Sequence, residues 1–185
     1  MTLANFFTIL RVLLIPVFMG LYYVDFSGHH LMAAGVFIIA CITDWLDGYV
    51  ARKMNQCSRF GAFLDPVADK MLVAITLVML AASYPSPWYI VPAALIVGRE
   101  VFVSALREWM AETQQRDAVA VGKIGKVKTT VQMIALIVLL ATDTSGPELI
   151  RITGYTLLNL AALLTLWSML VYLGGAWTQL KEGLK

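Results

Sequence analysis

The chain has 185 residues, of which 59% are hydrophobic and 14% are charged, and its net charge is +2. Soluble domains usually carry about 25% charged residues, so this composition excludes an ordinary soluble protein and favours one surrounded by lipid. The small net charge gives no reason to expect a nucleic-acid partner. Cys41 and Cys57 have no motif spacing, so neither a disulfide framework nor a structural zinc site is predicted. One domain covering residues 1–185 suits this length.

Six apolar segments follow one another along the chain, and each approaches the roughly 20 residues that a helix needs to cross a bilayer. They cover residues 6–24, 31–50, 66–82, 88–110, 127–141 and 150–173. Glycine and proline mark several of the turns between them, as at Gly28, Pro85 and Pro147. The sequence therefore predicts an all-α polytopic membrane protein built as a bundle of six transmembrane helices.

Basic residues gather on one side of the predicted bundle. They follow the second, fourth and sixth segments: Arg52, Lys53, Arg59, Arg107, Arg116, Lys123, Lys126, Lys128, Lys181 and Lys185. Because lysine and arginine accumulate in cytoplasmic loops, both termini and these connections are predicted to face the cytoplasm. Tyr84, Trp88 and Tyr89 would lie at the opposite interface as an aromatic belt.

Four aspartates stand where two apolar segments meet. Asp44 and Asp47 end the second segment, and Asp65 and Asp69 begin the third. Ionisable residues in membrane helices are costly and usually functional, and four carboxylates cannot all stay ionised at low dielectric without cations. Their oxygens suit Mg²⁺ or Mn²⁺, and two such ions would clamp a diphosphate. The alternative is that the carboxylates are solvated at the interface or paired with Arg52, Arg59 and Lys70.

Small residues lie beside these aspartates. An α-helix turns about 100° per residue, so Gly48 and Ala51 share the helix face of Asp44. Gly61 lies on the side of Asp65 if the third helix extends that far back. The face is therefore nearly bare, and a flat chemical group could approach the backbone there.

Residues 44–69 resemble the signature of the CDP-alcohol phosphotransferase family, D-x2-D-G-x2-A-R-x8-G-x3-D-x3-D, at every fixed position. The six segments, with the signature spanning the second and third, also fit this family. Residues 97–100, 104–109 and 125–130 are similar to those bacterial members that use a glycerol phosphate as acceptor. The likeness covers nearly the whole chain and implies the family's fold, a bacterial cytoplasmic membrane location and a homodimer.

The resemblance also implies roles for individual residues. Asp44, Asp47 and Asp65 would hold the metal ions, and Asp69 would both contact a metal ion and act as general base. The nucleotide of CDP-diacylglycerol would be accommodated by Gly48, Ala51, Gly61 and Arg52. The first segment has family-like positions at Asn5, Thr8 and Arg11, for which substrate contact competes with helix capping and interface anchoring.

The implied reaction is phosphatidyl transfer from CDP-diacylglycerol to sn-glycerol 3-phosphate, with release of CMP. The acceptor carries a phosphate, and the basic residues in the cytoplasmic half of the later segments could bind it: Arg99, Arg107, Lys126 and Lys128. The alternative for these residues is a basic cluster that only sets the topology. For Arg99, which stands inside an apolar run, the functional interpretation is favoured.

Other functions stay open at this point. Inositol phosphate would satisfy the same cations as glycerol phosphate, whereas serine as acceptor would leave them without a phosphate. An intramembrane prenyltransferase also combines aspartates with Mg²⁺ and a diphosphate, but does not require the Gly-x2-Ala-Arg continuation. A divalent-cation transporter is the non-enzyme alternative, although transporter sites tend to lie near the midplane of the bilayer.

Overall fold

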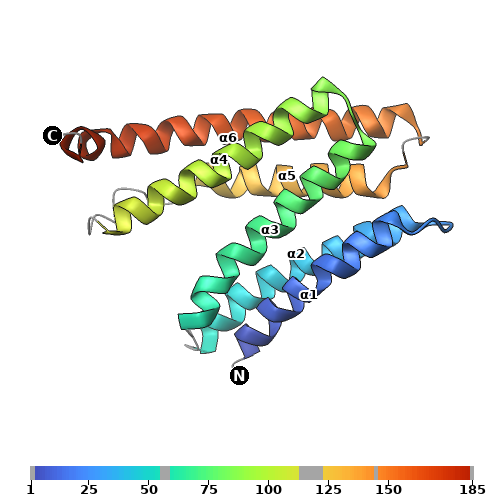
Figure 1. Ribbon diagram of the computed structural model, residues 1–185, viewed down its shortest axis with the longest axis horizontal. Coiled ribbons are helices and arrows are strands. Elements are labelled where there is room, and N and C mark those ends of the chain that lie inside the picture. Colours follow the sequence, from blue (N-terminus) through green and yellow to red (C-terminus); the bar gives the residue numbers. More distant parts are fainter. Residues whose placement is uncertain (1–2, 55–58, 113–122, 144–145, 184–185) are drawn as a thin grey trace. The chain divides into compact units, whose positions relative to one another are not determined.

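The structure is a computed structural model that describes residues 3–54, 59–112, 123–143 and 146–183. Within these ranges it does not describe the side chains at positions 3–5, 7, 45, 47–54, 59–63, 65, 111–112, 123–126 and 175–183. The described residues form six α-helices and no strand (Figure 1). The helices are α1 (Leu3–Tyr23), α2 (His29–Met54), α3 (Arg59–Ser83), α4 (Pro87–Glu112), α5 (Lys123–Ala141) and α6 (Glu148–Gly183). The predicted all-α class is therefore confirmed for this part of the chain.

Each predicted apolar segment falls on one of these helices. Three stretches are long and apolar enough to cross a membrane, namely Pro66–Ser83, Pro87–Met110 and Glu148–Gly174. The apolar stretches of α1, α2 and α5 are shorter, with 10–17 residues each. The whole helices have 21, 26 and 19 residues, or about 32, 39 and 29 Å at 1.5 Å per residue. These lengths match a hydrocarbon core about 30 Å thick, so six crossings remain the prediction.

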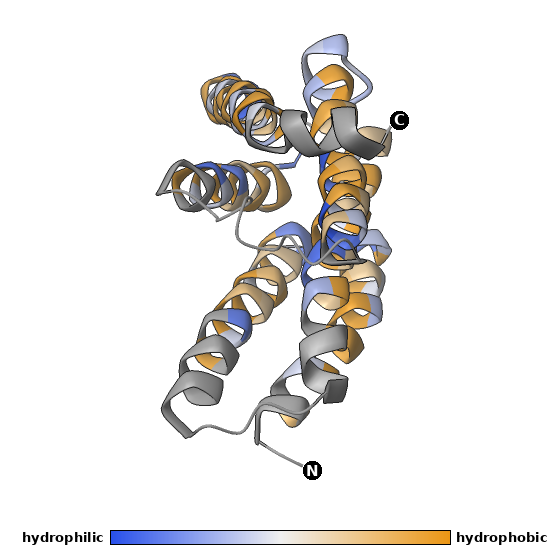
Figure 2. Cartoon of the chain, turned by 90° about the vertical axis from the view of Figure 1, so that its left-hand side faces the viewer, coloured by the Kyte–Doolittle hydropathy of each residue, from blue (hydrophilic) through white to orange (hydrophobic). Residues whose placement is uncertain are grey.

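Large apolar side chains are exposed on α1 to α6. Figure 2 shows that hydrophobic residues predominate along the described parts of the helices. Examples with more than half of their surface exposed are Leu13, Ile39, Val78, Val101, Val127 and Leu163. Soluble proteins rarely expose so much apolar surface, because water makes it unfavourable. Lipid chains carry no such cost, so the exposed side chains agree with a protein that lies in a membrane.

The chain forms two compact units, and each is described by itself. The first comprises Met1–Ser83 and Ile137–Arg151, and in it α1 packs against both α2 and α3. The buried rings of Phe18 and Phe37 join α1 to α2, with their centroids 6.0 Å apart. At the end of α1, the Tyr22 hydroxyl donates a 2.8 Å hydrogen bond to Ser83 Oγ on α3. The turn from α1 to α2 contains Gly28 at a φ of 87°, which a residue with a side chain rarely adopts.

The second unit comprises Tyr84–Leu136 and Ile152–Lys185, and therefore α4 with most of α5 and α6. Near the start of α4, Asn159 Nδ2 on α6 donates a 2.9 Å hydrogen bond to the Trp88 carbonyl oxygen. The rings of Tyr84, Tyr89 and Tyr155 pack against one another beside it. Tyr84 and Tyr89 are buried in the protein and Trp88 is exposed, so of these three only the Trp88 side chain is open to the surroundings, and its place at the membrane interface stays a prediction. A tyrosine near a helix end suits either environment, and tertiary packing decides between them.

The topology can be tested with single cysteines in a variant whose Cys41 and Cys57 are replaced by alanine. In intact cells, a membrane-impermeant maleimide should label Ser27→Cys and Ser86→Cys, because six crossings put both turns outside the cytoplasm. A cysteine added after Lys185 should react only after the membrane is opened. If only the three longest apolar stretches cross, the first two positions will lie on opposite faces, and that result would refute six crossings.

Candidate functional site

The backbone of the aspartate motif is helical on both sides of residues 55–58. Asp44 and Asp47 lie on α2, which continues to Met54, and Asp65 and Asp69 lie on α3. Helix α3 begins at Arg59, so Gly61 lies on the same helix as Asp65 and Asp69, as the prediction from the sequence required. Several predicted site residues lie outside the described side chains: Asn5, Asp47, Ala51, Arg52, Asp65 and Lys126, together with the surroundings of Gly48 and Gly61.

Asp44 forms an ion pair with an arginine of α1. Arg11 Nη1 lies 2.7 Å from Asp44 Oδ1, and the Arg11 side chain is 0% exposed, whereas that of Asp44 is 49% exposed. A fully buried guanidinium is strongly unfavourable unless an anion compensates its charge, and Asp44 supplies that anion. Thr8, one helical turn before Arg11, is also buried. Two of the three family-like positions of the first segment thus face the protein interior.

The first and last aspartates of the motif share one electrostatic neighbourhood. The charges of Asp69, Asp44 and Arg11 all act on the thiol of Cys41 on α2. Asp69 is partly buried on α3, so charged groups from α1, α2 and α3 meet near one point of the first unit. Cys41 is partly buried on α2, and its position near these charges indicates that it borders the acidic site.

The donor chemistry of this site suits a hard divalent cation. Among the described residues, no group of three or more His, Cys, Asp or Glu could hold a metal ion. The described residues include the side chains of Asp44 and Asp69 but not those of Asp47 and Asp65. Asp44 and Asp69 offer carboxylate oxygens, which Mg²⁺ and Mn²⁺ prefer, and one of them is half exposed. The described residues therefore fit two of the four predicted ligand positions.

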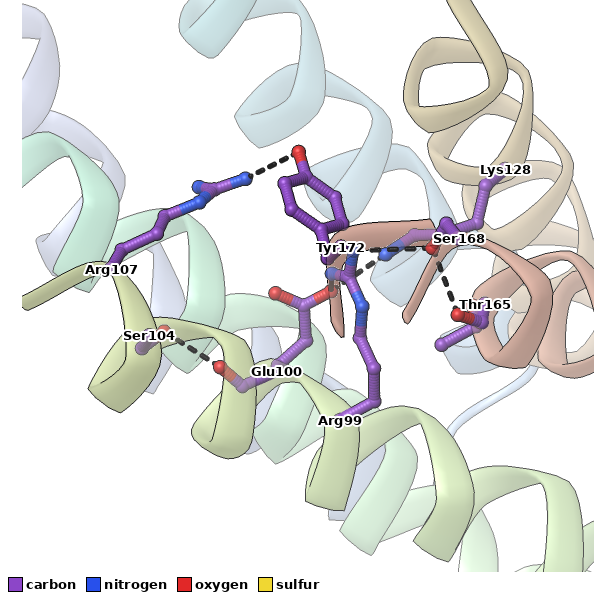
Figure 3. Close-up of polar contacts among 8 residues, drawn as sticks. All are labelled: Arg99, Glu100, Ser104, Arg107, Lys128, Thr165, Ser168 and Tyr172. Atoms are coloured by element: carbon purple, nitrogen blue, oxygen red, sulfur yellow. Dashed lines mark hydrogen bonds and ion pairs between the residues drawn. The ribbon is translucent and has the colours of Figure 1, made fainter. Parts of the chain in front are cut away.

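The second unit contains a compact cluster of opposite charge (Figure 3). Glu100 Oε1 accepts a 2.7 Å hydrogen bond from Arg99 Nη1 on the same helix and a 2.8 Å bond from Lys128 Nζ on α5. Arg99 is 7% exposed, Lys128 is 5% exposed and Glu100 is 28% exposed. One carboxylate oxygen therefore holds two buried cations together, at the junction of α4 and α5.

Helix α6 completes this cluster with three residues on one face. Arg99 Nη2 donates a 3.3 Å bond to Ser168 Oγ, which itself donates to the Thr165 carbonyl oxygen at 2.8 Å. Tyr172 Oη accepts a 3.0 Å bond from Arg107 Nη2. The Tyr172 ring also lies 5.8 Å from the Arg99 guanidinium carbon and 5.5 Å from that of Arg107, within the range of cation–π attraction. Tyr172 therefore positions both guanidinium groups, as Figure 3 shows.

The cluster carries a net charge of +2, since it contains one carboxylate, that of Glu100, and three cations, Arg99, Arg107 and Lys128. Buried Arg99 Nε has no hydrogen-bond acceptor among the described residues. A buried N–H group without an acceptor is costly, so such a donor is suited to a ligand or an ordered water molecule. The arrangement can bind an anion that carries two negative charges and several acceptor oxygens, such as a phosphate monoester.

The predicted acceptor residues Arg99, Arg107 and Lys128 therefore lie in one cluster, and the burial of Arg99 is confirmed. The residues predicted for this site do not include Glu100, Ser168 or Tyr172. Glu100 could have been found from its charge inside an apolar segment and from its spacing of seven residues to Arg107, which puts both on one helix face. Ser168 and Tyr172 have no comparable signal, because hydroxyl groups are common in membrane helices.

Known proteins resemble this chain over most of its length. Residues 1–173 match the family model described as CDP-alcohol phosphatidyltransferase. A Salmonella typhimurium protein named CDP-diacylglycerol–glycerol-3-phosphate 3-phosphatidyltransferase is 53% identical over 169 residues, which cover 91% of each chain. A Pseudomonas fluorescens protein of the same name is 48% identical over 182 residues, covering 98% of this chain and 93% of that one. A Shigella flexneri protein of this name is 52% identical over 169 residues, again 91% of each chain.

The importance of Glu100 for the cluster can be tested by a double-mutant cycle. Glu100→Gln should destabilise the protein by about 3 kcal/mol, because two buried cations lose their counter-charge. Adding Lys128→Met should cost less in the Glu100→Gln background than in the wild type, since the two residues interact directly. Thermal unfolding of the purified protein in detergent measures these changes.

Ser104→Ala is the matched control on α4, because it removes the 2.6 Å hydrogen bond from Ser104 Oγ to the Glu100 carbonyl oxygen and leaves the Glu100 carboxylate in place. It should change the unfolding temperature little. Additive effects of Glu100→Gln and Lys128→Met would show that the ion pair does not stabilise the cluster.

Proposed function

Because the chain belongs to the CDP-alcohol phosphatidyltransferase family, we propose that it transfers the phosphatidyl group of CDP-diacylglycerol to sn-glycerol 3-phosphate and releases CMP. The names of its relatives support this reaction, as does an aspartate motif intact at every fixed position. The product would be a phosphatidylglycerol phosphate, an intermediate in phospholipid synthesis. The proposed location is the bacterial cytoplasmic membrane, with the active site facing the cytoplasm.

The motif on α2 and α3 would bind the donor. Asp44, Asp47, Asp65 and Asp69 would hold two Mg²⁺ or Mn²⁺ ions, which neutralise the diphosphate and stabilise charge on the attacking and leaving oxygens when bound. The absence of large side chains at Gly48, Ala51 and Gly61 would leave room for the cytidine. Arg52 would contact the nucleotide, with Asn5 and Thr8 as further candidates on α1. The acyl chains stay in the lipid, where the exposed apolar side chains lie.

Asp69 is the proposed general base. Its carboxylate accepts the proton of the 1-hydroxyl group of sn-glycerol 3-phosphate, and the hydroxyl oxygen forms a bond to the phosphorus that carries diacylglycerol. The bond from this phosphorus to the oxygen of CMP breaks, and CMP leaves with that electron pair. Asp69 then returns its proton to solvent. The other residues bind and orient the reactants, as in other phosphoryl transfers.

The single observation that supports a phosphorylated acceptor is the Arg99–Glu100–Lys128 cluster with Arg107. Its net charge of +2 balances the nearly two negative charges of a phosphate monoester. Arg99 Nε would donate a hydrogen bond to the phosphate oxygens, as would the Arg107 nitrogens other than Nη2, which is bonded to Tyr172. Lys126 would add a positive charge at the start of α5. Serine has no phosphate to place there. Inositol phosphate has the same group, so the choice of glycerol phosphate rests on the relatives' names.

The reaction is tested by measuring CMP release from CDP-diacylglycerol by the protein in detergent with Mg²⁺. Separate reactions contain sn-glycerol 3-phosphate, inositol phosphate or serine. We expect release only with glycerol phosphate, no release with EDTA, and a loss of at least about 100-fold in kcat for Asp69→Asn, because the base is removed. Light scattering on the same preparation tests the homodimer implied by the family resemblance.

Release with inositol phosphate or serine would retain the family chemistry and refute the acceptor assignment. If folded protein releases no CMP with any acceptor, the proposed reaction is wrong.

The acceptor cluster is tested separately by Arg107→Met. Arg107 is exposed, so its replacement should leave the fold intact. Loss of a charged hydrogen bond of about 1.5–3 kcal/mol should raise KM for glycerol phosphate about 10- to 100-fold. KM for CDP-diacylglycerol should change little. Arg151→Met, which removes a cation paired with Glu148 in the first unit, serves as the control. Equal effects of both variants, or a change in KM for the donor alone, would contradict the assignment of Arg107.

A further inference from the structure

Arg11 is a charged residue in the middle of the apolar helix α1, and the proposed reaction gives it no role. Its side chain is 0% exposed, and it is among the largest fully buried side chains of the described residues. A guanidinium in such a place is costly, and its benefit to the protein must come from what it contacts. It forms an ion pair with Asp44, the first aspartate of the motif, at 2.7 Å.

The pair is asymmetric in its exposure. Arg11 is reached only from inside the protein, whereas 49% of the Asp44 side chain remains accessible. The carboxylate is therefore held at Oδ1 from the buried side and can still be approached from the open side. An ion pair from the buried side is one way to hold a ligand carboxylate, since metal-binding carboxylates usually have outer partners that fix them.

A second observation places Arg11 among the acidic residues and not only against Asp44. Arg11, Asp44 and Asp69 all act electrostatically on the Cys41 thiol, so the α1 cation lies in the same neighbourhood as acids from α2 and α3. An arginine also stays charged when it is buried, whereas a buried lysine readily loses its proton, so arginine maintains the ion pair with Asp44. A mere contact between helices would not require a charge at this point, because α1 and α2 already pack through Phe18 and Phe37.

We propose that Arg11 is a positioning residue that fixes Asp44 in the orientation needed to bind a divalent cation, and that α1 is therefore a third wall of the metal site. This inference rests on the proposed function, because it concerns the ions assigned to the four aspartates. Arg11 does not touch the reacting atoms and acts through Asp44.

The test is direct Mn²⁺ binding to the full-length protein in detergent, followed by the loss of the free-ion EPR signal. Arg11→Met should raise the Kd for Mn²⁺ about 10- to 100-fold, as the loss of outer partners does in other metal sites. Arg11→Lys, which keeps the charge, should recover part of the affinity. Asp44→Asn should weaken binding as well, and Arg11→Met added to it should have little further effect, since Arg11 acts through Asp44.

Tyr22→Phe is the matched control, because it removes the hydrogen bond to Ser83 that joins α1 to α3 at the other end of α1. It should lower the unfolding temperature without changing Mn²⁺ affinity. Unchanged or tighter Mn²⁺ binding by Arg11→Met would overturn the role of Arg11, as would equal weakening in Tyr22→Phe. If Arg11→Met does not fold, Arg11→Lys with an unchanged Kd decides against it. Failure of the wild-type protein to bind Mn²⁺ would instead refute the proposed metal site itself.

Discussion

The cost of burying charge is the constraint on which both candidate sites depend. In an apolar helix, a charged side chain is tolerated only when the protein itself supplies a partner, because neither lipid nor water compensates it there. Arg11 is compensated by Asp44, and Arg99 and Lys128 are compensated by a single oxygen of Glu100. The partners come from different helices in each case, so the ion pairs also determine which helix faces meet. The positions of the functional charges therefore help to determine how α1 packs on α2 and how α4 packs on α5.

The two groups of charges are complementary to the two halves of the proposed reaction. The diphosphate of the proposed donor would have to be neutralised, and a set of carboxylates could do this only through bound cations. The acceptor phosphate needs no metal ion, because the guanidinium and ammonium groups of the second unit supply permanent positive charge. Glu100 limits that charge to +2, so that a bound phosphate dianion would leave the cluster close to neutral. A cluster without this carboxylate would carry an uncompensated charge in either state.

The sequence predicts the fold and the aspartate motif well, because both depend on local signals. Apolar length marks each helix, and the spacing of Asp44, Gly48, Asp65 and Asp69 already requires two helical faces, which α2 and α3 provide. Arg99 is likewise recognisable as a buried cation from its apolar neighbours. The partner of a buried charge is not predictable in this way. Asp44 forms an ion pair with Arg11, which is 33 positions away in the chain, and no spacing within the motif points to that residue.

The same limit explains Tyr172 and the tyrosines at the start of α4. An aromatic residue with a hydroxyl group suits an interface, a buried core or a cation–π contact, and its sequence neighbours do not distinguish these. Tyr172 lies against two guanidinium groups because α6 presents it, four residues after Ser168, to the face of α4 that carries Arg99 and Arg107. Without that ring the repulsion between the two guanidinium groups would be less well compensated. The negative π-face of Tyr172 lowers this repulsion without adding a formal charge. A second carboxylate would also lower it, but its negative charge would weaken the binding of a phosphate.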